Sequence, residues 1–356
     1  MHSIILLRRA APLAAALITT LGAAAASAQN ASTAIVGCDE VGCPVNADTA
    51  TSECKLIDET FNEIGLARIP IGDGDDDGDD GDTDGQDAEL AGISWVQGNS
   101  VTDVGGSDDR YPTERVLRRD WYFGTPAGFD LGAQNTRACA AFFHKSMAAF
   151  PEGNTETAAG TCEQAMAPEC VNALVQRAQS LQFDADDSSD DLCGALEQDI
   201  LSNFDVECRD DAGSPYWRNV TVRPILGGSA PAVILSSDNI TSNCWPITPK
   251  EDDLAFIERL TTTTDDFGSD VLQNFFYGVT PILTAFYSGE GSPITTNTAQ
   301  MTCLKTMGPS PGSNQTVDED DDDDDDDDDD SAGTLVRAST TAALFIAASA
   351  ILASIS

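Results

Sequence analysis

Ten cysteines constrain this chain more than any other feature of its sequence. They all lie between residues 38 and 303. An even number of cysteines in a secreted protein predicts a framework of disulfide bonds, here five. Ten cysteines allow roughly 900 pairings, so the connectivity stays open. The cysteines are Cys38, Cys43, Cys54, Cys139, Cys162, Cys170, Cys193, Cys208, Cys244 and Cys303.

The N-terminus predicts entry into the oxidising compartment that disulfides require. Arg8 and Arg9 precede an Ala- and Leu-rich segment, and Ala26-Ser27-Ala28 fits a signal-peptide cleavage site. We therefore expect residues 1–28 to be removed. Four Asn-x-Ser/Thr acceptors remain in the mature chain and predict N-glycosylation. These acceptors are Asn30, Asn219, Asn239 and Asn314.

The C-terminus predicts attachment to a glycosylphosphatidylinositol (GPI) lipid. Three small residues, Ser331, Ala332 and Gly333, are followed by a short polar spacer and a weakly apolar tail, 341–356. A transmembrane helix is the alternative, but it needs about 20 apolar residues and usually basic residues beyond them. This tail is shorter and has no charge after it. We expect attachment at Ser331 and removal of residues 332–356.

Two acidic segments are too charged to fold. Residues 318–330 are thirteen consecutive Asp or Glu, and residues 73–87 include nine Asp. Like charges repel, and no apolar side chain is present to offset the entropy of ordering. We therefore expect a disordered stalk over 313–331 and a disordered loop over 73–87. The remaining region, 29–312, is the predicted disulfide-rich ectodomain.

The charge of the ectodomain excludes one class of partner. Without the two cleaved signals, 15 Lys and Arg face 60 Asp and Glu, a net charge of −45. The two acidic segments carry 22 of these negative charges, so the rest of the ectodomain is still strongly acidic. Nucleic-acid binding requires basic residues that neutralise phosphates, and docking onto anionic lipid head groups requires the same. Neither is expected.

Hydrophobic patterns predict strands first and helices later. Short runs of branched and aromatic residues predict strands over 64–71, 93–96 and 115–123. Residues 216–236 are expected to form further strand and turn. Within the third of these strands, the dibasic pair Arg118-Arg119 is interpreted as part of a polar face, with proteolytic processing as the alternative.

Helical signals follow from about Cys139 onward. Pro168 is placed to begin a helix, and Ser189 or Asp190 can cap a second one. The sequence Thr248-Pro-Lys-Glu251 resembles a capping box and predicts a third helix through Leu260. Residues 270–287 predict a fourth, bent or divided at its proline. The resulting fold class is α+β, with a β-rich N-terminal part followed by a helical, disulfide-stabilised part and the acidic stalk.

The sequence offers no catalytic constellation. The mature chain has a single histidine, His144, which excludes zinc sites built from several histidines. No Gly-x-Ser-x-Gly motif is present. A lone histidine beside Phe142 and Phe143 is expected to be a packed or surface residue. We predict no catalytic residue and no bound cofactor, apart from the calcium alternative below.

The Asp-rich loop is a weak candidate for calcium. Asp73, Asp75 and Asp77 have the spacing that begins an EF-hand loop, and Asp84 occupies its twelfth position. An EF-hand has a bidentate Glu at that position and flanking amphipathic helices, and both are missing here. A disordered loop is therefore the leading interpretation, with weak calcium binding by these four aspartates as the alternative.

Four stretches resemble a known group of proteins. They are WYFGTP at 121–126, ACAAFF at 138–143, TCEQAM at 161–166 and CVNALVQRA at 170–178. They are similar to secreted, GPI-anchored cell-surface proteins of filamentous ascomycete fungi, over about half of the mature chain. The resemblance implies a location at the plasma membrane or cell wall, and it implies no reaction.

Three functions are consistent with these observations. The first is a GPI-anchored, N-glycosylated cell-surface or cell-wall protein with a structural, adhesive or interaction role, whose partners are the membrane through its lipid and cell-wall glycans or other surface proteins. The second is a glycan-active hydrolase or transglycosidase that uses paired carboxylates, with tryptophans that stack on sugars. The third is a weak calcium-binding module. The candidate tryptophans are Trp95, Trp121, Trp217 and Trp245.

Overall fold

The computed structural model describes residues 35–37, 54–56, 59–69, 92–104, 114–132, 135–151, 153–182, 188–202, 206–209, 215–239, 252–266, 268–292, 294 and 296–308. The predicted signal peptide, the loop 73–87, the stalk 313–331 and the propeptide 332–356 lie outside these residues, and they stay predictions.

Strands dominate the described residues and pair into two antiparallel sheets and a small hairpin. The four-stranded sheet has the order β11-β10-β6-β7, the five-stranded sheet has the order β3-β4-β5-β9-β8, and β1 pairs with β2. The strands are Cys54–Leu56 (β1), Glu59–Phe61 (β2), Glu63–Arg68 (β3), Ser94–Val104 (β4), Glu114–Thr125 (β5), Arg137–His144 (β6), Asn219–Leu226 (β7), Val233–Ile234 (β8), Asp253–Thr264 (β9), Thr280–Tyr287 (β10) and Thr298–Leu304 (β11).

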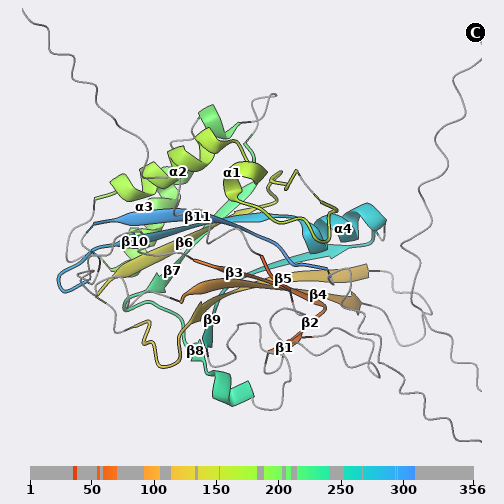
Figure 1. Ribbon diagram of the computed structural model, residues 1–356, viewed down its shortest axis with the longest axis horizontal. Coiled ribbons are helices and arrows are strands. Elements are labelled where there is room, and N and C mark those ends of the chain that lie inside the picture. The colour runs from red at the N-terminus through yellow and green to blue at the C-terminus, as the bar shows by residue number, and fades with distance from the viewer. Residues whose placement is uncertain are drawn as a thin grey trace, which may run out of the picture. The chain divides into compact units, whose positions relative to one another are not determined.

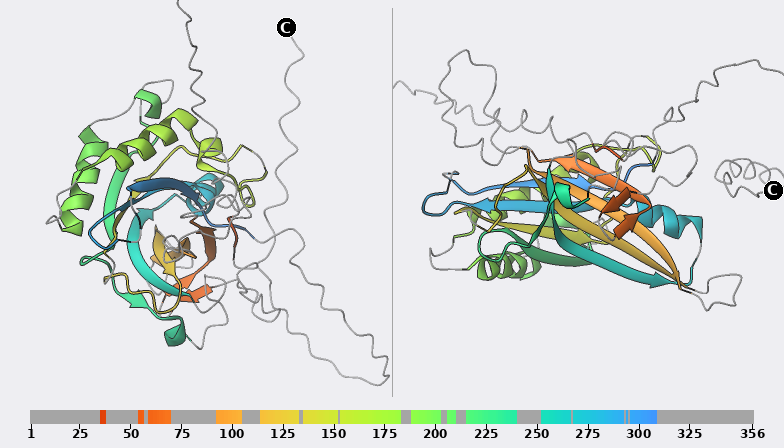
Figure 2. Two further views of the ribbon diagram at one scale, coloured as in Figure 1. Left: turned by 60° about the vertical axis from the view of Figure 1, so that its left-hand side comes forward. Right: turned by 90° about the horizontal axis from the view of Figure 1, so that it is seen from below.

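Helices cover the outer face of the four-stranded sheet. α1 (Cys162–Ala165), α2 (Pro168–Ser180) and α3 (Ser189–Ser202) lie over β6, β7, β10 and β11 (Figure 1). The β1–β2 hairpin contacts β4 on the five-stranded sheet. Strand β11 meets β3, and β7 meets β9, so the two sheets enclose a common core along both edges (Figure 2). A fourth helix, α4 (Ser269–Tyr277), precedes β10.

Alternation along the strands divides the core into layers, because successive side chains point to opposite faces of a sheet. In β6, Cys139 and Phe143 pack beneath the helices, whereas Ala140 and Phe142 pack between the sheets. The core between the sheets is aromatic: Trp95 lies edge-on to Phe142, with ring centroids 5.4 Å apart. Such contacts contribute about 0.5–1.5 kcal/mol beyond the burial of their area.

Three disulfides lie in the helical layer. Cys139–Cys193 joins β6 to α3, and Cys162–Cys303 joins α1 to β11. Cys170–Cys208 joins α2 to a short 3-10 helix, Val206–Cys208. These bonds confirm the prediction of disulfides for six of the ten cysteines. Cys38, Cys43 and Cys244 lie outside the described residues, as does the side chain of Cys54, the first residue of β1.

Two predicted helices are confirmed. α2 begins at Pro168 and buries Val171, Leu174 and Ala178 on one face. α3 begins at Ser189 and buries Leu192, Leu196 and Ile200. In both, the apolar residues follow the 3.6-residue period of a helix that packs on one side only. The expected strands over 64–71, 93–96 and 115–123 correspond to β3, β4 and β5, with somewhat different bounds.

The expectation of a helical second part is wrong for three segments, and two share one cause. Cys139 lies in β6, and residues 280–287, predicted as helix, form β10 after α4 ends at Tyr277. Both strands are central in their sheet and are buried on both faces along nearly their whole length. A strand covered on both sides has a continuous apolar sequence with no period of two, and such a run is easily mistaken for a helix.

The third error has a different cause, a β-bulge. Residues 253–260, predicted as part of the helix that begins at Thr248, lie in β9, which continues to Thr264. Its register with β5 shifts between Trp121 and Tyr122, where Glu258 and Phe256 are the successive partners. The extra residue moves the alternation by one position, so Ile257 and Leu260 both pack toward the core between the sheets although they are three residues apart. This spacing imitates a helix.

Candidate functional site

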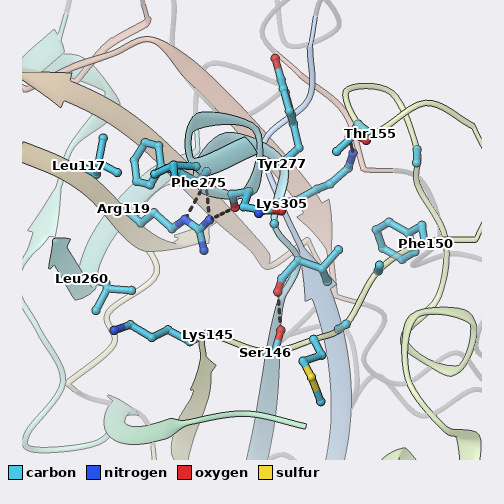
Figure 3. A pocket seen from close by; sticks show the side chains of 18 of the residues that line it. Leu117, Arg119, Lys145, Ser146, Phe150, Thr155, Leu260, Phe275, Tyr277 and Lys305 are labelled. Carbon is cyan, nitrogen blue, oxygen red and sulfur yellow. Dashed lines mark hydrogen bonds between the residues drawn. The ribbon is translucent and has the colours of Figure 1, made fainter. Parts of the chain in front are cut away.

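A cavity of about 580 Å³ opens at one end of the space between the sheets. Its walls come from β5, β9, the segment after β6, residues 153–158, α4 and Lys305 (Figure 3). Apolar residues such as Leu117, Leu260 and Phe275 share the lining with nearly as many polar ones. A cavity of this size that combines apolar and polar groups can hold a small molecule.

Helix α4 forms one wall of the cavity, and it ends at a glycine that no other residue can replace. Gly278 follows the helix, and its backbone N–H donates to the carbonyl of Asn274 (3.1 Å). A Cβ atom at Gly278 would lie 2.3 Å from that carbonyl oxygen and 3.0 Å from Nη2 of Arg119. Glycine is therefore required where α4, β5 and the start of β10 converge.

Arg119 of β5 caps the C-terminal end of α4. Its Nε donates to the carbonyl of Phe275 (2.9 Å), and its Nη2 donates to the carbonyls of Asn274 (2.7 Å) and Phe275. The guanidinium carbon lies 5.2 Å from the centroid of the Phe275 ring. A cation stabilises the negative end of the helix dipole here. Burial lowers the pKa of Arg119 to about 10, so the group remains charged at neutral pH.

Lys305 is buried on another wall, at 1% exposure. Its Nζ donates to the carbonyls of Thr155 (2.6 Å) and Glu156 (3.4 Å), and it lies 5.7 Å from the ring centroid of Tyr277. Burial lowers the pKa of Lys305 to about 8, and the charges of Glu63 and Glu156 oppose this shift. Lys305 thus fixes residues 153–158 beside the cavity.

Glu63 of β3 connects three elements behind this wall. Tyr277 of α4 donates its hydroxyl to Oε1 of Glu63 (2.7 Å), and Thr306 donates to Oε2 (3.2 Å). Burial raises the pKa of Glu63 to about 7; the two hydrogen bonds oppose the shift, Glu156 adds to it and Lys305 opposes it. Burial also raises the pKa of Tyr277, and the negative charge of Glu63 raises it further. The carboxyl group therefore titrates near neutral pH.

A buried chain of side-chain amides extends from the core to α4. The indole N–H of Trp121 donates to Gln97 (3.0 Å), and the amide of Gln97 donates to Asn99 (3.1 Å). Asn99 in turn donates to the carbonyl of Phe276 (2.9 Å) at the end of α4. Gln97 and Asn99 are fully buried and face inward on β4, on the same face as Trp95. Buried polar chains of this kind hold their partners in one arrangement when every group is satisfied.

His144 is a packed core residue at 2% exposure. Its ring stacks on Phe142 and lies 5.3 Å from the ring of Trp121, and Nε2 is 2.9 Å from the hydroxyl of Thr221. Burial lowers the pKa of His144 to about 4, with smaller contributions from Arg119, Arg223 and Lys145. The imidazole is therefore neutral at physiological pH.

The residues singled out in the sequence do not converge on one site. Trp95, Trp121 and Trp217 are buried in the core, where no sugar ring can stack on them, and Trp245 lies outside the described residues. The four aspartates Asp73, Asp75, Asp77 and Asp84, the attachment residue Ser331 and the acceptors Asn30 and Asn314 also lie outside the described residues. Asn219 is exposed at the start of β7. Asn239 ends a 3-10 helix, and its side chain is not described.

Sequence reasoning missed the residues that build the cavity. Arg118 and Arg119 were expected to share a polar face, yet they point to opposite sides of β5. Arg118 pairs with Glu59 on the outer face, and Arg119 points inward to α4. The strand alternation was the available signal, because neighbouring residues in a strand cannot share a face.

The described residues contain neither a metal-binding cluster nor a membrane-spanning helix. No group of three or more His, Cys, Asp or Glu side chains in the part of the chain that the structure describes could hold a metal ion. In the same residues, no helix is both long enough and apolar enough to cross a membrane.

Comparison with protein-family models, with curated protein sequences and with solved structures finds no match to this chain.

Proposed function

We propose that this chain is an extracellular binding protein that takes up a small, largely apolar molecule in the cavity beneath α4. The observation that carries the proposal is the cavity itself, about 580 Å³, in which an apolar patch that includes Leu117, Leu260, Val271 and Phe275 lies between the two sheets. Its walls are fixed by hydrogen bonds from Arg119, Asn99 and Lys305 to backbone carbonyls. A preformed pocket loses less conformational entropy on binding than one that must be ordered by its ligand.

Binding of a small molecule would be the interaction role that the sequence predicts at the cell surface. The predicted signal peptide and the GPI signal at Ser331 support an address on the outer face of the plasma membrane or in the cell wall. A Ser331→Trp variant with Gly333→Trp should lose the lipid, because the attachment site requires small residues. If that variant stayed at the cell surface after treatment with a phospholipase specific for phosphatidylinositol, a GPI anchor at Ser331 would be ruled out.

A glycan-active enzyme receives no comparable support. Paired Asp or Glu side chains would have to face a common cleft, about 5–10 Å apart. Among the described residues that line the cavity, none is Asp or Glu. Binding is therefore the function that the cavity favours.

Binding of a neutral fluorescent probe tests the proposal. The purified, detergent-free protein expressed from the full-length sequence should enhance the fluorescence of Nile red with one site per chain. Val271→Trp, on α4, should fill the cavity and abolish the signal, because Val271 lines it. Equal fluorescence for the wild type and Val271→Trp would show that the dye binds elsewhere, and the proposal would fail.

A further inference from the structure

The cavity has a charge opposite to that of the protein around it. The chain carries 60 Asp and Glu against 18 Lys and Arg, a formal net charge of −42. Three of these few cations, Arg119, Lys145 and Lys305, line the cavity, and no acidic residue does so among the described lining. A local reversal of charge in a low-dielectric cavity attracts a ligand of the opposite sign.

Lys305 does not supply this attraction. Its Nζ is bound to two backbone carbonyls, and Glu63 and Glu156 lie close enough to raise its pKa against the effect of burial. What separates Lys305 from Arg119 is this pair of carboxylates, which balances its positive charge. The cations that remain are Arg119 and Lys145.

One nitrogen of the Arg119 guanidinium, Nη1, is available to a ligand. Its hydrogen bonds to α4 leave from Nε and Nη2, and Nη1 makes none to any described residue. In Figure 3, this nitrogen points away from α4, on the side of the cavity where Leu260 and Lys145 also lie. A guanidinium nitrogen that is already oriented by two other bonds loses little entropy when it binds an anion.

Lys145 is unpaired and held in an unusual backbone conformation. It is exposed, and no described residue forms a hydrogen bond or ion pair with its Nζ. Its φ of 51° makes it the one non-glycine residue with positive φ in the described part of the chain. This conformation is uncommon for lysine and is found preferentially at functional sites. It places a free ammonium at the rim of a cavity that already contains Arg119.

We propose that the ligand is an amphipathic monocarboxylate, whose carboxylate is bound by Nη1 of Arg119 and by Lys145 while its apolar part fills the cavity. This inference rests on the proposed binding function. Leu117, Leu260, Val271 and Phe275 supply the apolar contacts. A planar carboxylate suits a guanidinium edge. The helix C-terminus that Arg119 caps repels any anion, and it repels a phosphate monoester, with its charge near −2, more strongly than a carboxylate.

Probes that share one apolar chain and differ in their head group test this proposal. Calorimetric titration at neutral pH with decanoate, decanol, decylammonium and decyl phosphate should rank decanoate first, at least about tenfold tighter than decanol. Lys145→Asn should weaken decanoate roughly three- to tenfold and leave decanol unchanged. Asparagine tolerates positive φ, so this variant removes the charge without straining the backbone.

Two controls locate the effect. Arg177→Gln removes an equal charge from α2, on the far side of the four-stranded sheet, and should leave decanoate affinity unchanged within about twofold. Val271→Trp should abolish decanoate binding. Equal affinity for decanoate and decanol, tighter binding of decyl phosphate or decylammonium, or an unchanged decanoate affinity in Lys145→Asn would overturn the ligand class while Nile red binding still supported the cavity. If the wild type bound neither Nile red nor decanoate, both the ligand class and the proposed binding function would be overturned.

Discussion

The α-helices of the described residues form two groups that are held by different forces. α1, α2 and α3 bury an apolar face, and three disulfides tie them to β6, β11 and the 3-10 helix. α4 is held by hydrogen bonds from Arg119, Asn99 and Tyr277, and none of the three disulfides reaches it. Covalent and apolar attachments suit a fixed scaffold. Polar attachments depend on charge and break at lower cost, which is the property expected of an element that borders a binding cavity.

Among the three disulfides of the described residues, removing the one that closes the longest loop should have the largest effect, because it breaks the scaffold side of this contrast. Cys162 and Cys303 are separated by 141 residues. Their bond reduces the entropy of the unfolded chain, and replacing both with Ala should lower the free energy of unfolding by about 4–5 kcal/mol. Urea denaturation followed by the fluorescence of the buried Trp95 and Trp121 measures the loss.

The shorter disulfide is the matched control. Cys170 and Cys208 are 38 residues apart, so the double Ala variant at these positions should lose less stability, because the entropy of loop closure rises with loop length. If the two double variants lose the same stability, strain or packing rather than chain entropy controls the scaffold.

Gly65→Ala should break the wall that faces α4. The backbone of Lys305 crosses so close to β3 that a Cβ atom at Gly65 would lie 1.8 Å from the carbonyl oxygen of Lys305. Backbone atoms must move to relieve this overlap, and we expect a loss of about 3 kcal/mol in the free energy of unfolding. Gly194 in α3 has no atom within 4 Å of the added methyl group, so Gly194→Ala should stabilise by about 0.5–1 kcal/mol. A Gly65→Ala variant as stable as the wild type would contradict the close approach.

Arg119→Met should loosen α4 and leave the other helices intact. The change removes the donors to the carbonyls of Asn274 and Phe275 and the positive charge over the Phe275 ring. We expect a loss of about 2 kcal/mol and faster hydrogen exchange of the α4 amides, with α2 and α3 unchanged. Arg177→Met on α2, which breaks a 3.4 Å pair with Asp199 of α3, should cost less than about 1 kcal/mol. Faster exchange throughout the protein in Arg119→Met would show that α4 is part of the scaffold.

The same contrast explains what the sequence could predict. α2 and α3 pack on one side only, so their apolar residues carry a clear helical period. The start of α2 at Pro168 was predicted correctly, whereas α3 begins at Ser189 after the cap Ser188, just before the expected caps Ser189 and Asp190. β6 and β10 are covered on both sides, and β9 contains a bulge, so none of the three has a plain period of two. Burial on two faces is a property of the tertiary structure and leaves no local pattern.

The cavity was beyond local reasoning for a related reason. Arg119, Lys145 and Lys305 are far apart in the sequence and meet only because β5, the end of β6 and the end of β11 converge on one end of the sheets. Each is flanked by residues that give it no distinguishing motif. Only the positions of Gln97 and Asn99, which are polar at buried sites on the same face as Trp95, departed from the pattern of an apolar inward face.

A change in pH should affect α4 more than the scaffold, and Glu63→Gln isolates this smallest effect. The pKa of Glu63 is raised to about 7 from 4.5, mainly by burial. Because the folded-state pKa is the higher one, the stability that Glu63 contributes is complete below its unfolded pKa and is lost as the pH rises through 7. Glutamine stays neutral, so the variant should gain about 1–2 kcal/mol relative to the wild type between about pH 5 and about pH 8.

Subtraction of the two profiles removes the other titrating groups. The pKa of His144 is lowered to about 4 and that of Lys305 to about 8. The contribution of each group to the stability of the fold is therefore lost as the pH falls. Both shifts have the sign opposite to that of Glu63, and both groups are present in either protein, although Lys305 also senses the charge of Glu63. If ionisation of the buried Glu63 carboxylate loosens α4, the protection factors of the α4 amides, which correct for base-catalysed intrinsic exchange, should fall above pH 7 in the wild type and not in the variant. Parallel profiles of the two proteins would show that Glu63 does not link the state of α4 to pH.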